Sequence, residues 1–121
     1  MIDFLSSIRY NVNMKEIIYY KTIEGKCPYQ KWFFKLDKSI QIRITDRLER
    51  VVEGNYGDFK PLGSDISELK FTVGKGYRIY FAEQDNIVVI ILSGGDKSDQ
   101  SNDIKKAKEY FKDYIERNKN E

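Results

Sequence analysis

Apolar and polar residues alternate from Glu68 to Phe81, on both sides of a Gly-Lys-Gly turn. Successive side chains of a β-strand point to opposite faces of a sheet, so this pattern predicts a hairpin. The apolar side chains, which we expect in the core, are Leu69, Phe71, Val73, Tyr77, Ile79 and Phe81. The polar side chains of the other face are Lys70, Thr72, Arg78 and Tyr80. The second face of the hairpin therefore gathers two cations and a phenol.

The expected register brings these polar side chains close together. If the turn closes with Val73 opposite Tyr77, then Lys70 lies opposite Tyr80 and diagonal to Arg78, at about 7–8 Å. That separation suits the oxygens of a phosphodiester, and a nearby phenol can stack on a base or transfer a proton. A solvated sheet face is the alternative interpretation of the same pattern.

The segments before the hairpin predict a strand and two helices. Residues 15–22 contain the run IIYY, which is typical of a strand. Pro28 suits the first turn of a helix, and a short first helix is expected to end at Leu36. A second helix is expected over 37–53, with an apolar face made of Ile40, Ile44, Leu48 and Val51. We expect these two helices to form an antiparallel hairpin.

The segments around and after the hairpin complete the predicted fold. Residues 55–63 are rich in turn formers and are expected to form a loop. The unbroken apolar run 87–92 predicts an interior strand that is covered on both faces. A third amphipathic helix is expected from the spacing of Ile104, Ala107, Phe111 and Ile115. The predicted class is α+β: an N-terminal strand, a two-helix hairpin, a three-strand antiparallel meander and a C-terminal helix.

Composition limits the domain organisation and the location of the protein. The 121 residues are 40% hydrophobic, which suits a single domain over 1–121. Residues 1–13 fit no strong periodic pattern; an N-terminal extension and a start codon assigned too far upstream are the two interpretations. No apolar run reaches about 18 residues, so no membrane span is expected. The single cysteine, Cys27, forms no internal disulfide, and we expect a cytoplasmic protein.

Charge and the absence of histidine restrict the possible chemistry. The net charge is only +2, so binding of a polyanion would depend on clustering of the cations. Because the chain has no histidine, it has neither a Ser-His-Asp triad nor a histidine-ligated zinc site. Cys27 precedes Pro28 and has no histidine to activate it, which makes it a poor nucleophile. No metal or cofactor is expected, and any chemistry would use Lys, Arg, Tyr, Asp or Glu.

Further cations extend the candidate surface beyond the hairpin strands. Lys97 follows the last predicted strand in a glycine-rich turn, from which it can reach the same sheet face. The candidate RNA-binding residues are Lys60, Thr72, Lys75, Arg43 and Arg47. The two arginines belong to a basic stripe on the second helix, which alternates with acidic residues. A mixed stripe of this kind is also typical of an ordinary solvated helix face.

Several of these segments together resemble a known family. They are Trp32, RLERVVEGNYGDFKPLG, ELKF, GKGYRIYF and LSGGDKSDQSNDIKKA, within about Ile17 to Ala107. The chain resembles the RelE/ParE superfamily of toxin–antitoxin toxins, in its HigB-like "addiction module killer protein" branch. This resemblance implies a RelE-like fold with helices packed on one face of the sheet. RelE-like members cut messenger RNA in the ribosomal A site, whereas ParE-like members inhibit DNA gyrase without nuclease chemistry.

The resemblance implies functional roles for Lys70, Arg78 and Lys97. The chain departs from the RelE pattern at Glu68, where RelE has a lysine, and near Asp103, where RelE has a tyrosine. Cleavage through the 2′-OH of RNA needs a base, charge stabilisation on the phosphorane and an acid, and no metal is obligatory. Lys70 is the candidate base, which requires the adjacent Arg78 to favour its neutral form, and Arg78 would hold the phosphate oxygens. Lys97 or Tyr80 would act as the acid that protonates the leaving 5′-oxygen.

The expected function is that of the toxin of a type II toxin–antitoxin system, a ribosome-dependent mRNA endonuclease that inhibits translation. The alternative is a ParE-like gyrase inhibitor, which would need cations only for contact with its target. Expected partners are the ribosome, its mRNA and a cognate antitoxin with a helix-turn-helix domain. The complex with the antitoxin would bind operator DNA.

Overall fold

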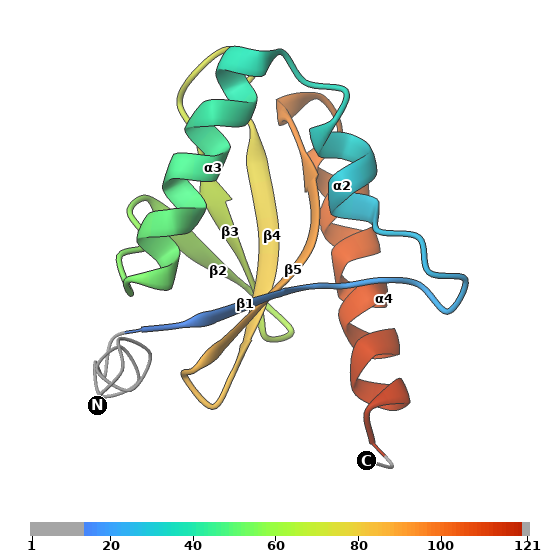
Figure 1. Ribbon diagram of the computed structural model, residues 1–121. Helices are drawn as coiled ribbons and strands as arrows, with labels where there is room; N and C mark the ends of the chain where they lie inside the picture. The colour runs from blue at the N-terminus through green and yellow to red at the C-terminus, as the bar shows by residue number, and fades with distance from the viewer. Residues whose placement is uncertain (1–13, 120–121) are drawn as a thin grey trace, which may run out of the picture.

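The computed structural model describes residues 14–119, so the expected extension over 1–13 lies outside the described residues. The described chain forms, in order, β1 (Glu16–Tyr19), α2 (Pro28–Phe33), α3 (Lys38–Val52), β2 (Phe59–Gly63), β3 (Ile66–Lys70), β4 (Arg78–Gln84), β5 (Val88–Gly95), the 3₁₀ turn η1 (Lys97–Asp99) and α4 (Gln100–Arg117). The α+β class is confirmed (Figure 1). No helix within 14–119 is both long enough and apolar enough to cross a membrane.

The strands form one sheet in the order β1-β5-β4-β3-β2. β1 pairs with β5 in parallel, while the other neighbours are antiparallel. The meander therefore has four strands rather than three, because β2 occupies a segment that was predicted to be a loop. Pro61 lies within β2, and proline is tolerated there because β2 is an edge strand.

The register of the β3–β4 hairpin also differs from the predicted one. Lys70 pairs with Arg78, and the backbone N–H of Phe71 donates to the carbonyl of Tyr77. The strand ends at Lys70 instead of continuing to Val73, so a longer loop joins β3 to β4. This register brings Lys70 directly opposite Arg78, with Tyr80 opposite Glu68.

Helices cover both faces of the sheet, which corrects the expectation that all of them lie on one face (Figure 1). The predicted apolar residues of α3 pack with Leu69, Ile79 and Phe81 on one face. On the other face, Ala107 of α4 packs with Tyr80 and neighbouring apolar residues. β5 contributes alternate residues to both clusters and is therefore an interior strand, as predicted: Val89 and Ile91 on one side, Ile90 and Leu92 on the other.

α2 is shorter than expected and packs mainly against β5 rather than forming an antiparallel hairpin with α3. The amide of Gln41 in α3 donates hydrogen bonds to the carbonyls of Phe33 and Leu36, which fixes the connection between the helices. Trp32 of α2 lies on Gly94, so α2 is beside the carboxyl end of β5, after which the loop with Lys97 begins.

Candidate functional site

Three predicted site residues meet at the end of the sheet where β3 leads into β4. Lys70 and Arg78 are direct partners across the two strands. The guanidinium of Arg78 donates a hydrogen bond to the carbonyl of Gly76. The stem of Lys97 lies against the same glycine, since a Cβ at Gly76 would stand 2.7 Å from its Cε. Gly76 is therefore the common neighbour of Arg78 and Lys97, next to the Lys70–Arg78 pair.

The turn before β4 depends on this glycine. Gly76 has a φ of +71°, a conformation that residues with a Cβ rarely adopt, and its N–H donates to the carbonyl of Val73. The backbone N–H of Lys97 donates to the carbonyl of Lys75 at 3.3 Å, which joins this turn to the loop after β5. Lys75 and Lys97 are both exposed, so the two loops present neighbouring cations to solvent.

Two of the predicted catalytic residues are buried, which corrects the expectation of an open cationic face. Arg78 is 5% exposed, and its Nε lies 3.5 Å from Oε2 of Glu68, itself buried. Tyr80 is fully buried in the cluster under α4. Glu68, a position at which the chain departs from the RelE pattern, is thus the ionic partner of Arg78. Of the four predicted catalytic side chains, Lys70 and Lys97 are the exposed ones.

Two polar side chains that were not predicted as site residues, Ser93 and Asp103, lie close to Tyr80. Tyr80 pairs with Ser93 of β5, and neither hydroxyl has a hydrogen-bond partner among the described residues. The carboxyl group of Asp103 lies directly on Gly95, where a Cβ would overlap it. Burial, together with Asp99, raises the pKa of Asp103. The signal in the sequence was the pair of glycines in the segment SGGD, which leaves room for side chains above the strand.

The remaining predicted RNA-binding residues fall into two places. A groove of ≈ 640 Å³ between α3 and the end of β3 is lined by Arg43, Arg47, Arg50, Lys70 and Thr72, together with Asp46 and Asp58. Lys60 lies apart from this groove, exposed on the edge strand β2 and opposite Glu68. The structure therefore brings Arg43, Arg47 and Thr72 together with Lys70, and leaves Lys60 outside.

Arg47 has a structural role within this groove. Its guanidinium donates hydrogen bonds to the carbonyls of Tyr56, Asp58 and Lys70 and lies 4.8 Å from the centre of the Phe71 ring. Because its donors are engaged, we revise the prediction of direct RNA contact to a positioning role. Through its hydrogen bond to the Lys70 carbonyl, Arg47 positions the backbone at Lys70, and it contributes its charge to the groove.

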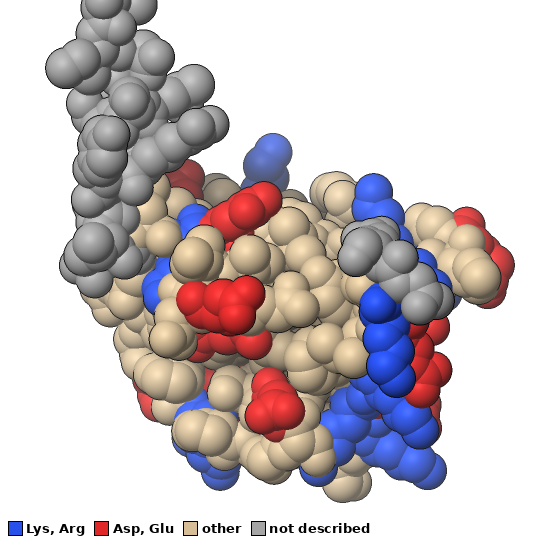
Figure 2. Space-filling model, turned by 90° about the horizontal axis from the view of Figure 1, so that it is seen from below, with Lys and Arg blue, Asp and Glu red and all other residues tan. Residues whose placement is uncertain are grey.

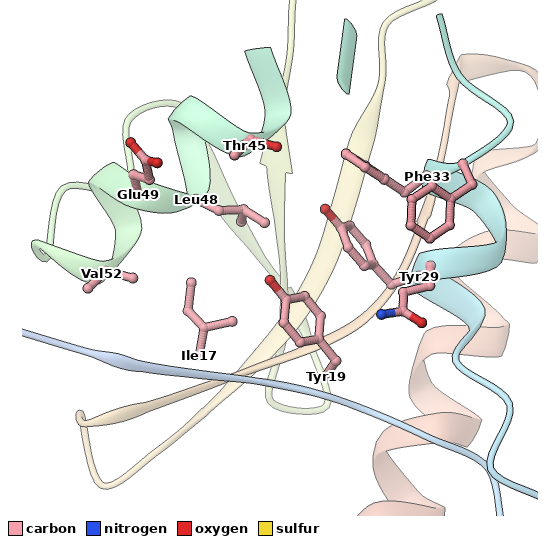
Figure 3. A pocket seen from close by; sticks show the side chains of 10 residues that line it. Ile17, Tyr19, Tyr29, Phe33, Thr45, Leu48, Glu49 and Val52 are labelled. Carbon is pink, nitrogen blue, oxygen red and sulfur yellow. The ribbon is translucent and has the colours of Figure 1, made fainter. Parts of the chain in front are cut away.

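The other end of the molecule and an apolar hollow beside β1 differ in character from the cationic groove. Figure 2 views the end where the β2–β3 and β4–β5 turns lie; there, carboxylates are scattered over uncharged side chains and cations gather at one side. Figure 3 shows a hollow between β1, α2 and α3, in which the rings of Tyr19 and Tyr29 stack with centroids 5.3 Å apart. Burial raises the pKa of both phenols. None of the predicted site residues lines this hollow.

Within residues 14–119, no group of three His, Cys, Asp or Glu side chains is arranged to hold a metal ion.

The buried phenol of Tyr80 predicts a loss of stability in alkali. Burial, with smaller contributions from Asp103 and Glu68, raises the pKa of Tyr80 to about 12. A tyrosine in the unfolded chain ionises near pH 10, so this contribution is complete below about pH 10 and is lost as the pH rises towards 12. Between neutral pH and about pH 11, the free energy of unfolding falls in the unaltered protein. In Tyr80→Phe this fall should be smaller by about 1 kcal/mol.

Urea unfolding at neutral pH and at about pH 11 measures this difference. Tyr20→Phe is a second test of the same effect, because the pKa of Tyr20 is also raised to about 12, by burial and by its hydrogen bond to Asp113. Both variants should therefore show a reduced alkaline loss. An unchanged loss in Tyr80→Phe would mean that its hydroxyl is accessible to solvent.

Comparison with known proteins gives one clear relationship. No protein-family model matches the chain. An uncharacterized protein of Haemophilus influenzae (strain ATCC 51907 / DSM 11121 / KW20 / Rd) is 42% identical over 87 residues, which cover 71% of this chain and 88% of that protein. Identity at this level over most of both chains shows common ancestry, and the chain belongs to the same family as this Haemophilus influenzae protein.

Proposed function

We propose that the protein is the toxin of a type II toxin–antitoxin system, in the HigB-like branch of the RelE/ParE superfamily. In this proposal it is a ribosome-dependent mRNA endonuclease that inhibits translation in the cytoplasm. The observation that carries the proposal is the meeting of Lys70, Arg78 and Lys97 around the Gly76 turn, beside a groove with further cations. A strand, two helices, an antiparallel meander and a final helix, in that order, are also compatible with a RelE-like topology.

The chemistry proposed for this site is cleavage of RNA through its own 2′-OH. The 2′-oxygen attacks phosphorus, the bond from phosphorus to the 5′-oxygen breaks, and the products carry a 2′,3′-cyclic phosphate and a 5′-OH. The base takes the 2′-OH proton, and the acid supplies a proton to the leaving 5′-oxygen. Lys70 is proposed as the base or as a stabilising charge, and Lys97 as the acid, because both are exposed at the Gly76 turn. No metal or other cofactor takes part in this scheme.

The buried residues receive different roles in this scheme. Arg78 is ion-paired with Glu68 and bonded to Gly76, so it positions the turn and adds positive potential. Tyr80 lies beneath α4 and does not reach RNA in this conformation, so it is replaced as the proton donor by Lys97. Arg43, Thr72 and Lys75 are proposed to contact the RNA backbone, with Lys60 at the edge of that surface.

The burial of Arg78 and Tyr80 favours a second candidate function. A ParE-like gyrase inhibitor needs no base and no acid, and its exposed cations would serve only to complement an acidic partner. For either function, the proposed partner is a cognate antitoxin with a helix-turn-helix domain, whose complex with the toxin binds operator DNA. The ribosome and its mRNA are partners only of the endonuclease.

Expression without an antitoxin tests the proposal. Induction should arrest growth, and the purified protein should cut mRNA on translating ribosomes without inhibiting gyrase supercoiling. Normal growth at confirmed folded expression would contradict a toxin of either kind. Inhibition of supercoiling without mRNA cutting would identify the second function. Tyr80→Phe should remain toxic, because its buried hydroxyl takes no part in the proposed reaction.

A further inference from the structure

A second groove lies at the carboxyl end of β5, between α2 and the first turns of α4. Figure 1 shows the positions of these three elements. Its volume is ≈ 290 Å³. Three lysines line it, together with the rings of Trp32 and Tyr110: Lys31 from α2, Lys35 from the turn that follows α2, and Lys106 from α4. Cations interleaved with aromatic rings are the features with which proteins hold the phosphates and bases of single strands.

Two consecutive glycines bring side chains from both helices down onto β5. A Cβ at Gly94 would overlap the Trp32 ring, and a Cβ at Gly95 would overlap the Asp103 carboxyl group. Trp32 and Asp103 can therefore lie close to the strand backbone only because both positions lack side chains. The aromatic ring and the carboxylate of the groove thus lie against the backbone of β5.

The floor of the groove contains a polar group without a partner. Ser93 lines the groove and is 8% exposed, and its Oγ has no hydrogen-bond partner among the described residues. A buried hydroxyl in this state is unfavourable, and a polar atom of a ligand in the groove would satisfy it. Ser93 is an independent indication that the groove receives a ligand with hydrogen-bonding groups.

We infer that this groove binds one nucleotide of single-stranded RNA, with its base against the aromatic rings, its phosphates at the lysines and its polar edge towards Asp103 and Ser93. The inference deepens the proposed function by adding a subsite for the substrate. Gly95, on which Asp103 lies, is the cross-strand partner of Arg78, so Asp103 is close to the strand that carries Arg78. In this inference, an RNA strand that passes Lys70 and Lys97 places a neighbouring nucleotide in this groove.

The carboxylate gives the subsite a base preference. An ionised carboxylate only accepts hydrogen bonds, so it pairs with the exocyclic amino group of cytosine and repels the carbonyl oxygen that uracil has at the same position. Asp103 should therefore favour cytosine over uracil, two bases of the same size. Replacement by asparagine supplies both a donor and an acceptor and should remove the preference.

The fluorescence of Trp32 reports on the groove directly, because it is the only tryptophan of the chain. The experiment titrates the full-length protein at low salt and about pH 8 with oligocytidylate and oligouridylate of about six nucleotides, a length that single-strand sites accommodate. We expect quenching of Trp32 as the base stacks, several-fold tighter binding of oligocytidylate, and loss of this difference in Asp103→Asn. Lys106→Ala should weaken binding several-fold and reduce its salt dependence.

Lys105→Ala is the matched control, because Lys105 is an exposed lysine of the same helix that does not line the groove. Equal effects of Lys105→Ala and Lys106→Ala, or equal quenching by base-free polyphosphate, would overturn the inference. Equal binding of the two oligonucleotides would overturn the role of Asp103. The titration involves neither ribosomes nor cleavage, so it is separable from the proposed function. A protein that cuts mRNA without Trp32 quenching contradicts the subsite alone, and one that binds RNA without cutting contradicts the endonuclease alone.

Discussion

Lys70→Met is expected to slow single-turnover cleavage of mRNA on programmed ribosomes by about 10²–10³-fold at saturating protein. Lys70 is exposed, lies directly opposite Arg78 and lines the cationic groove, so its ammonium group can reach a phosphate placed at the Gly76 turn. Methionine retains a flexible apolar stem and removes the charge. Loss of a group that stabilises charge in the transition state lowers the rate even when all of the substrate is bound.

Cleavage rates at increasing protein concentration distinguish a catalytic role of Lys70 from a role in RNA binding alone. If Lys70 only binds a phosphate, the variant will cut at the normal rate once enough protein is added, and its salt dependence will be smaller. Lys112→Met is the matched control, because Lys112 is an exposed lysine of α4 that lines no described groove, and it should cut normally. A normal saturated rate in Lys70→Met would contradict a catalytic role for Lys70.

The alternating pattern of the hairpin predicted the faces of the strands but not their register. Leu69, Ile79 and Phe81 lie in the core as expected, while Lys70 pairs with Arg78 instead of Tyr80. The two registers differ by two residues, and a shift of two leaves every side chain on its original face. Hydrophobic alternation therefore cannot distinguish them. The length of the glycine-containing loop decides the register, and that length is not encoded in the alternation.

The polar face was expected to be open because its sequence contains cations and a phenol. In the structure, the apolar face of α4 packs on the middle of this sheet face and excludes solvent from it. Glu68 compensates the charge of Arg78 there, so the pair can be buried. Lys70 and Lys97 could be chosen as candidate site residues from charge and position, and both are exposed. The placement of Asp103 could not be predicted, because it depends on the side chains that the glycines at the end of β5 admit.

β2 was missed for a related reason. Its residues include Pro61 and Gly63, which are typical of turns. An edge strand is paired on one side only, so it tolerates residues that an interior strand would not. The pairing of Phe59 with Leu69 and of Lys60 with Glu68 comes from the neighbouring strand rather than from the β-propensity of the segment.

Arg78→Met is expected to reduce the free energy of unfolding by about 3–5 kcal/mol, the usual cost of removing one member of a buried ion pair. The Glu68 side chain is 5% exposed and would remain in the interior without its cationic partner. The variant also loses the hydrogen bond from the guanidinium to the carbonyl of Gly76. Urea unfolding of the purified variants measures the loss.

The double variant Glu68→Leu/Arg78→Met should recover most of this stability, because well-packed apolar residues can replace a buried ion pair at little cost. Arg117→Met is the control at the exposed pair of Arg117 and Asp113, 2.9 Å apart, where solvent screens the charges and a much smaller loss is expected. Equal losses in Arg78→Met and Arg117→Met would show that the Glu68–Arg78 pair is accessible to water. Recovered stability without mRNA cutting in the double variant would identify Arg78 as a residue that acts on the reaction through the Gly76 turn, beyond its part in the fold.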